Sequence, residues 1–486
     1  RLFINKICIF LLWNFIMINL IKPIISSEYF NDRKLESGLS INLKVMRSGK
    51  IKIINTDYLP QRVYVNGILT AIDKSAYIII EEEGINNVTI EWDAKKKPAK
   101  CAKMFQKIDC IIGVDFSDFD FSGITTMKSM FVSCENLQDI IFSENIDTFS
   151  LMEMTTMFEG CSLLQSLDLS SFNTSNVKYM DGMFKNCISL ISLNLTNFIT
   201  PKLTKIKEMF YGCEALKNLE IPNIETSQIN DMDSLFYNCF SLTSLDITNF
   251  NTQKVKIMSR MFATCGSLKS LDLSNFDTTS VTTMNYMFSE CKSLVNLNLS
   301  TFQTTNVREM NSIFKSCEKL KSIELSTISI SKATISSMFS GCKSITSLDL
   351  SHFDFSNKNM EFFFSDCSSL KYIKFSQEKK LVTNVERMFS GCTSLTSLDI
   401  SSFDFKKITN LNYLFFNCNL LTSLDFSNVD ASLVTTMAYM FGGCNSLKTV
   451  NLTNFATSSV ILMGSMFADC SSLISLDLSS FNTSKV

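Results

Sequence analysis

The chain is poor in the residues on which many enzyme sites depend. Its 486 residues include a single histidine, His352, whereas Ser-His-Asp and Cys-His catalysis need a histidine as the base. The sequence also contains no glycine-rich phosphate loop and no paired-histidine metal motif. His352 follows Ser351 in what reads as a surface turn, with no nucleophile at a recognisable spacing. We therefore expect a protein that is not an enzyme and that uses no cofactor.

An excess of either charge is missing too. Lysine and arginine together number 45, and aspartate and glutamate 47, which gives a formal net charge of -2. Surfaces that bind nucleic acid or acidic membranes concentrate basic residues. The short basic run Lys95–Lys97 reads as a solvated linker. We expect no nucleic-acid partner and no membrane contact beyond the N-terminal segment.

The closely spaced cysteine pairs that bind zinc are also absent. Most of the cysteines recur at one position of a repeated unit and so form a column. Neighbouring cysteines of this column should lie one unit apart, about 4.8 Å, whereas the Cβ atoms of a disulfide lie about 3.8 Å apart. We therefore expect buried free thiols in the column, and no metal. Cys101 and Cys110 lie outside it, and a bridge involving one of them stays open. Fourteen of the 17 cysteines recur at intervals of 25 to 27 residues and form this column: Cys134, Cys161, Cys187, Cys213, Cys239, Cys265, Cys291, Cys317, Cys342, Cys367, Cys392, Cys418, Cys444 and Cys470.

What the sequence does contain is one unit repeated many times. The stretch Met261–Tyr286, MFATCGSLKSLDLSNFDTTSVTTMNY, returns nearly unchanged in the units before and after it. A period of this length, sustained over hundreds of residues, is typical of a solenoid in which each unit contacts its neighbours. Residues 104–486 contain about fifteen units of 25–27 residues, and we expect the last to be truncated at Val486.

The first half of each unit predicts a strand. In the unit that begins at Cys161, the apolar residues Leu167 and Leu169 alternate with the polar residues Asp168 and Ser170. Alternation with a period of two is typical of a short strand with one buried face. Equivalent strands of successive units would pair in parallel, about 4.8 Å apart.

The second half of the unit predicts a short helix. Its apolar residues recur at spacings of three and four, which is one face of a helix, and a glycine such as Gly160 often precedes the cysteine, where it would suit a helix end. We thus predict an α/β solenoid: a right-handed, leucine-rich-repeat-like coil with a parallel concave sheet and short helices on the convex side, preceded by a small β domain. The residues with this spacing in the second half are Val177, Met180, Met183, Phe184 and Cys187.

The frame MFxxCxxLxxLDLSxFxTxxVxxM resembles the repeat of BspA-like leucine-rich-repeat surface proteins, also described as a mycoplasma-type surface lipoprotein repeat. The resemblance covers residues 104–486. It implies a secreted or cell-surface protein that mediates adhesion or protein–protein recognition. No lipobox-like approach of small residues precedes Cys8, so the resemblance does not extend to a lipid anchor.

The region before the repeats falls into two parts. In residues 1–27 a lysine precedes the apolar run Ile7–Ile21, and Ser26 and Ser27 follow, which indicates a signal peptide; an uncleaved signal anchor is the alternative. Residues 28–100 predict a small β-rich domain that caps the solenoid, with hairpins at Arg47–Gly49 and at Asn66–Gly67.

The position directly after Leu167 and its equivalents is polar in nearly every unit. These residues form a polar ladder, which should line the concave face. Calcium needs six to eight oxygens wrapped around the ion, which a flat column does not supply, so we expect a solvated acidic face. Ile141 is its single apolar member. The other members are Asp115, Asp168, Asn194, Glu220, Asp246, Asp272, Asn298, Glu324, Asp349, Lys374, Asp399, Asp425, Asn451 and Asp477.

One unit departs from the pattern and predicts the partner-binding site. After Cys367, Tyr372 replaces the usual Ser or Thr, and Lys374 replaces the acid. An aromatic residue beside a cation is typical of interface anchors. The alternative is that Lys374 only relieves repulsion between its acidic neighbours. The predicted partner-binding residues are Asp349, Tyr372, Lys374, Asp399 and Asp425.

Six sequons offer candidate glycosylation sites if the chain is secreted by a eukaryotic route. The function that we predict is recognition of an extracellular protein or other surface ligand through the concave face. The alternatives are a carbohydrate-binding protein, and a structural coat or spacer protein without a specific ligand. The sequon asparagines are Asn87, Asn173, Asn194, Asn298, Asn451 and Asn482.

Overall fold

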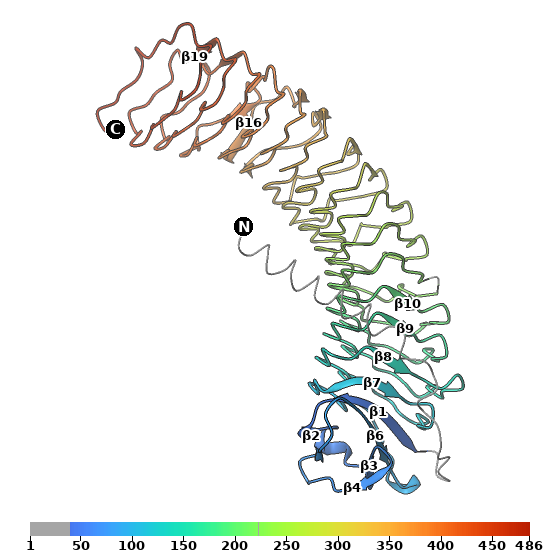
Figure 1. Cartoon of the computed structure of the whole chain (residues 1–486). Coiled ribbons are helices and arrows are strands. Elements are labelled where there is room, and N and C mark those ends of the chain that lie inside the picture. Colours follow the sequence, from blue (N-terminus) through green and yellow to red (C-terminus); the bar gives the residue numbers. More distant parts are fainter. Residues whose placement is uncertain (1–38, 222) are drawn as a thin grey trace. The chain divides into compact units, whose positions relative to one another are not determined.

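The computed structural model describes residues 39–221 and 223–486. The predicted signal peptide or anchor, residues 1–27, lies outside the described residues. From Leu39 to Val486 the chain forms one compact unit, in which a small N-terminal sheet is followed by a stack of similar coils, here called rungs (Figure 1). No helix in this described part is both long and apolar enough to cross a bilayer.

The N-terminal sheet and the first rungs share their hydrogen bonds. Six strands follow the order β4-β3-β6-β1-β7-β8, in which β1 pairs antiparallel with β7, the first strand of the repeat region. The backbone of that strand is thereby covered. The strands are β1 (Ser40–Met46), β3 (Arg62–Val65), β4 (Ile68–Thr70), β6 (Ile85–Glu91), β7 (Ile111–Asp115) and β8 (Asp139–Ile141).

One of the two predicted hairpins is formed. Val65 pairs with Ile68 across the Asn66–Gly67 turn, which joins β3 to β4. The hairpin predicted around Arg47–Gly49 is wrong, because β2 (Gly49–Lys52) pairs instead with β5 (Tyr77–Ile80) in a separate two-stranded sheet.

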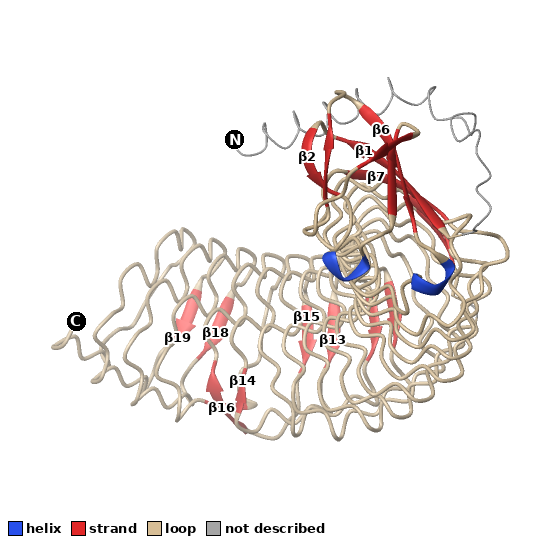
Figure 2. Cartoon of the chain, turned by 90° about the horizontal axis from the view of Figure 1, so that it is seen from below, coloured by secondary structure: helices blue, strands red, loops and turns tan. Residues whose placement is uncertain are grey.

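The predicted parallel strands form in part of the stack, as separate pairs rather than one continuous sheet. The equivalent segments 218–220, 244–246, 270–272, 397–399 and 475–477 are not strands. Each strand of these pairs has three residues, of which the first and last are exposed except the half-buried Asn194 of β10. The strands lie along one surface of the stack, here called the sheet face (Figure 2). Leu167 of β9 and Leu193 of β10 are paired, buried central residues of such strands. The pairs are β9 (Ser166–Asp168) with β10 (Ser192–Asn194), β11 (Asn296–Asn298) with β12 (Ser322–Glu324), β13 (Ser347–Asp349) with β15 (Tyr372–Lys374), and β18 (Ser423–Asp425) with β19 (Thr449–Asn451).

The predicted short helices on the convex side are wrong. The described residues contain no α-helix, only the 3₁₀ turns Thr56–Tyr58 and Ala94–Lys96, and Figure 2 shows nearly all of the stack as turns and loops. The predicted helical segment consists of two consecutive four-residue turns, closed by bonds from the Met183 N–H to the Met180 carbonyl (3.2 Å) and from the Cys187 N–H to the Phe184 carbonyl (3.1 Å).

Positive φ angles and bonds between rungs explain why no helix forms. The third residue of each turn, Gly182 or Asn186, has φ of 58°, as a type II turn requires. The Phe184 N–H, which in a helix would bond four residues back, donates instead to the Met209 carbonyl of the next rung at 2.9 Å. Two such turns place apolar residues at i, i+3, i+4 and i+7, the same spacing as one face of a helix.

Two columns of side chains fill the interior. Fifteen phenylalanines, from Phe105 to Phe467, stack along the axis with ring centroids 5.3–5.9 Å apart. Beside them, each of the fourteen column thiols donates to a phenylalanine carbonyl of the previous rung, as Cys265 does to Phe236 at 3.2 Å.

The prediction of free thiols is confirmed. All described cysteines are free, including Cys101 and Cys110, and all are buried except the half-buried Cys470. Desolvation raises the pKa of the Cys265 thiol to about 12, so the sulfur stays protonated and serves as a hydrogen-bond donor.

Candidate functional site

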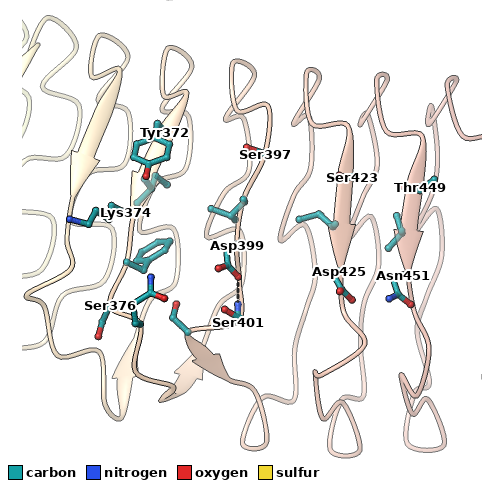
Figure 3. A pocket seen from close by; sticks show the side chains of 17 residues that line it. Tyr372, Lys374, Ser376, Ser397, Asp399, Ser401, Ser423, Asp425, Thr449 and Asn451 are labelled. Atoms are coloured by element: carbon teal, nitrogen blue, oxygen red, sulfur yellow. Dashed lines mark hydrogen bonds between the residues drawn. The ribbon is translucent and has the colours of Figure 1, made fainter.

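A groove of about 730 Å³ opens on the sheet face over four successive rungs. Strand β15 (Tyr372–Lys374) forms one wall, and β18 and β19 line the far side (Figure 3). Between them lies the segment Ser397–Asp399, which is not paired as a strand with either neighbour. The groove therefore coincides with a break in strand pairing, where Leu398 is only half-buried.

The backbone next to the groove also departs from the repeat. After β15, residues Ser376–Lys379 replace the usual turn, and β16 (Lys380–Asn384) then runs between β14 (Lys358–Asn359) and β17 (Phe403–Asp404). This three-stranded sheet occurs at no other described rung. It places Ser376 and Gln377 at the margin of the groove.

Tyr372 is the most exposed aromatic side chain of the groove. Its exposed fraction is 61%, and Figure 3 shows the ring on the sheet face beside the rung of Ser397 and Asp399. Equivalent positions in the neighbouring rungs hold the small polar residues Ser347, Ser397 and Ser423. A large ring among small hydroxyl side chains provides a prominent apolar contact area on the groove surface.

Lys374 forms an ion pair with only one of its two acidic neighbours. Its Nζ lies 2.9 Å from Oδ2 of Asp349, which pairs with it across β13 and β15. Hydrogen bonds from Ser351 and Lys374 hold the pKa of the Asp349 carboxyl well below its usual range. Asp399, on the other side, forms no ion pair within residues 39–221 and 223–486.

Most ladder residues have a structural role that the sequence did not reveal. Asp399 accepts the N–H of Ser401 at 2.9 Å, the dashed line in Figure 3, and Asp425 accepts the N–H of Ser427 at 2.9 Å. Such caps stabilise the turn that ends each strand. Twelve members make this bond to the residue two positions on: Asp115, Asp168, Asn194, Asp246, Asp272, Asn298, Glu324, Asp349, Asp399, Asp425, Asn451 and Asp477.

The structure brings four of the five predicted binding residues together. Tyr372, Lys374, Asp399 and Asp425 line the groove, and Asp349 contacts it only through its ion pair with Lys374. Whether they bind a partner stays a prediction. Of the sequon asparagines, Asn451 lines the groove.

The remaining candidates for chemistry are His352 and the residue types that bind metal ions. A ring nitrogen of His352 lies 2.9 Å from the Leu325 carbonyl, in the bonding pattern of a structural side chain. The described part of the chain holds no group of three or more His, Cys, Asp or Glu residues arranged to bind a metal ion.

Sequence reasoning missed a second departure, in four successive rungs of which three line the groove. At the third position of the first turn, Phe362, Arg387, Tyr413 and Tyr439 follow one another. The Arg387 guanidinium lies 4.0 Å from the Tyr413 ring centroid and 5.7 Å from that of Phe362, and Tyr413 stacks on Tyr439 at 5.1 Å. The signal is visible in an alignment of the repeats, at the residue that precedes Met388 and its equivalents. The units on either side have the small residues Ser337 and Ser465 at this position.

The chain is similar to several proteins of known structure and to one protein family. A leucine-rich cell surface protein from Faecalibacterium prausnitzii has 18% identity and a TM-score of 0.36 over 68% of this chain and 83% of that one. A leucine-rich-repeat protein from Eubacterium ventriosum has 18% identity and a TM-score of 0.39 over 74% and 83%. For a Leptospira interrogans LRR protein the values are 16%, 0.23, 71% and 81%.

No curated protein matches the chain. The model of the family described as "Mycoplasma protein of unknown function, DUF285" matches residues 99–219, 204–328, 295–399, 333–445 and 383–486. These overlapping matches cover the whole repeat region, in agreement with the resemblance drawn from the repeat frame. The chain therefore belongs to the DUF285 family.

Proposed function

We propose that this protein is a recognition scaffold that binds an extended, positively charged segment of another protein in the sheet-face groove. The observation that carries the proposal is the coincidence of the groove with two departures from the repeat. The turn after β15 is replaced, and Tyr372 is exposed where the neighbouring rungs have serine. Two features shared with other rungs add to these: the strand pairing is interrupted, and Asp399 and Asp425 lack ion-pair partners within the described chain.

The charges of the groove favour a basic partner. Lys374 is paired with Asp349, outside the groove lining, so Asp399 and Asp425 leave the groove itself acidic. Each carboxylate uses one oxygen as a turn cap and keeps lone pairs for a partner. Tyr372 would add the buried aromatic contact that is frequent at interface hot spots.

The test is photo-crosslinking from two equivalent positions of the sheet face. A photoreactive amino acid at position 397 lies in the groove, and one at position 244 occupies the same repeat position several rungs away. We expect a specific adduct from position 397 alone, which excess unlabelled protein competes away. As the unlabelled competitor, the Tyr372→Ser variant should compete about tenfold more weakly. Equal adducts from both positions would contradict the proposal.

A second candidate is a glycan, which the exposed Tyr372 ring among hydroxyl, amide and carboxylate side chains also favours. The crosslinking experiment separates the two, because a glycan partner would resist proteolysis of the adduct and be lost after glycosidase treatment. We further infer that the protein acts outside the cytosol, on the basis of the signal-like segment 1–27. Retention of the full-length chain inside the producing cell would contradict that inference.

A further inference from the structure

A second, smaller pocket lies on another part of the surface, among rungs that precede the groove. Its volume is about 420 Å³. Three of its lining residues, Ile188, Glu214 and Phe240, each come directly after a column cysteine and so belong to one column of the repeat. Backbone bonds from Ala215 to Ile188 and from Ser241 to Glu214 stack three rungs there, so Glu214 lies between Ile188 and Phe240.

The two walls of this pocket are exceptions within their column. Ile188 and Phe240 are the two large apolar members of a column that is otherwise polar or glycine, and they are 42% and 53% exposed. Exposed apolar side chains that occur singly are ordinary. Two of them at matching positions on either side of one carboxylate form a slot with apolar walls and an acidic base.

Both the ring and the carboxylate of the slot are held in place. The Phe240 ring covers Gly266, where an added Cβ would come within 2.6 Å of a ring atom, so any larger residue there would displace the ring. Asn238 Nδ2 donates to Glu214 Oε1 at 2.8 Å. Glu214 forms no ion pair within the described residues, and its second oxygen is left to accept from outside the chain.

We propose that this slot is a binding site for an arginine side chain of a partner protein. The aliphatic part of such a side chain would pack between Ile188 and Phe240, and its guanidinium would lie on the Phe240 ring and donate to Glu214. Arginine suits the site better than lysine, because a planar guanidinium stacks on a ring while it hydrogen-bonds a carboxylate. The site is independent of the sheet-face groove, which shares none of its residues.

The test uses N-acetyl-arginine methylamide as the probe and the Ile188 methyl resonance of the full chain as the reporter. We expect a saturable shift of that resonance at millimolar concentrations. The citrulline derivative has nearly the same shape without the charge and should bind at least tenfold more weakly. The lysine derivative should bind several-fold more weakly.

Two variants complete the test. Glu214→Gln and Phe240→Ser, the latter a residue type found elsewhere in this column, should each weaken the arginine probe at least tenfold. The methyl resonance of the buried Ile408 should stay unchanged in both, which reports an intact fold. Equal shifts with the citrulline derivative, undiminished binding to Glu214→Gln, or no saturable shift of the Ile188 methyl would overturn the proposal.

Discussion

Asp425 on β18 lies directly opposite Asn451 on β19, and each caps the turn that ends its own strand. Along the ladder, each of the five parallel strand pairs has at most one carboxylate at its two ladder positions. None of the four acid–acid neighbours is paired, as expected for like charges opposite each other, although five other ladder neighbours, Lys374/Asp399 among them, are unpaired too. The acid–acid neighbours are Glu220/Asp246, Asp246/Asp272, Glu324/Asp349 and Asp399/Asp425.

Neutralising the middle acid of the longest acidic run should stabilise the stack. In Asp246→Asn the amide keeps the cap to Thr248 while repulsion from Glu220 and Asp272 falls. We expect the free energy of unfolding to rise by about 0.2–1 kcal/mol at low salt. Urea denaturation at low and high salt measures it, and the gain should shrink with salt.

The matched control is Asp168→Asn, whose ladder neighbours are Ile141 and Asn194. This variant removes a charge without relieving repulsion, so no gain in stability is expected. If the free energy of unfolding rose equally in both variants, the gain would come from replacing a carboxylate by an amide and not from relieving repulsion between ladder acids.

Acid should destabilise the protein through the turn caps. Hydrogen bonds from Ser170 lower the pKa of the Asp168 carboxyl, and hydrogen bonds from Ser274 lower that of Asp272. Because the folded-state pKa lies below the unfolded value of about 3.9, this stabilisation is present above that value and is lost as the pH falls through the folded pKa. Thermal melts between pH 7 and 2 should show the melting temperature falling below about pH 4. A flat profile there would contradict the capping role.

Backbone strain at the turns predicts opposite effects for two substitutions at one repeat position. Thr264 and Gly160 each precede a column cysteine, with φ of 60° and 75°. A left-handed conformation costs an L-residue about 1–2 kcal/mol, partly offset by the greater freedom of unfolded glycine. Thr264→Gly should therefore raise the free energy of unfolding by up to about 1 kcal/mol, and Gly160→Ala should lower it by about 1 kcal/mol.

Steric clash does not account for the Gly160→Ala effect, since the nearest atom to an added Cβ lies 3.5 Å away. Equilibrium unfolding in urea measures both variants. Changes of the same sign would show that these turns are not under the strain that their φ angles indicate.

The column thiols should be unreactive in the folded protein. They are buried and donate hydrogen bonds, and desolvation raises the pKa of Cys187 and Cys265 to about 12, so almost no thiolate is available near neutral pH. A thiol reagent followed by mass mapping should label the half-buried Cys470 first and the rest of the column only after unfolding. Linked pairs of neighbouring column cysteines in unreduced protein would contradict this.

The sequence by itself determined the repeat, the inward-facing columns, the cysteine chemistry and the unit that breaks the pattern at Tyr372. These follow from composition and spacing, because a residue that recurs at one position of a solenoid must occupy the same environment in every rung. The apolar column positions, among them the phenylalanines from Phe105 to Phe467, were therefore readable without coordinates.

Only the tertiary structure decided between turns and helices, and which strands pair. Two consecutive turns and one helix produce the same apolar spacing at Met180, Met183, Phe184 and Cys187. The choice depends on hydrogen bonds to the next rung, about 26 residues away, which no local pattern encodes. The groove beside Tyr372 and the slot around Glu214 likewise arise from side chains in different rungs. Their chemistry exists only after the coils are stacked.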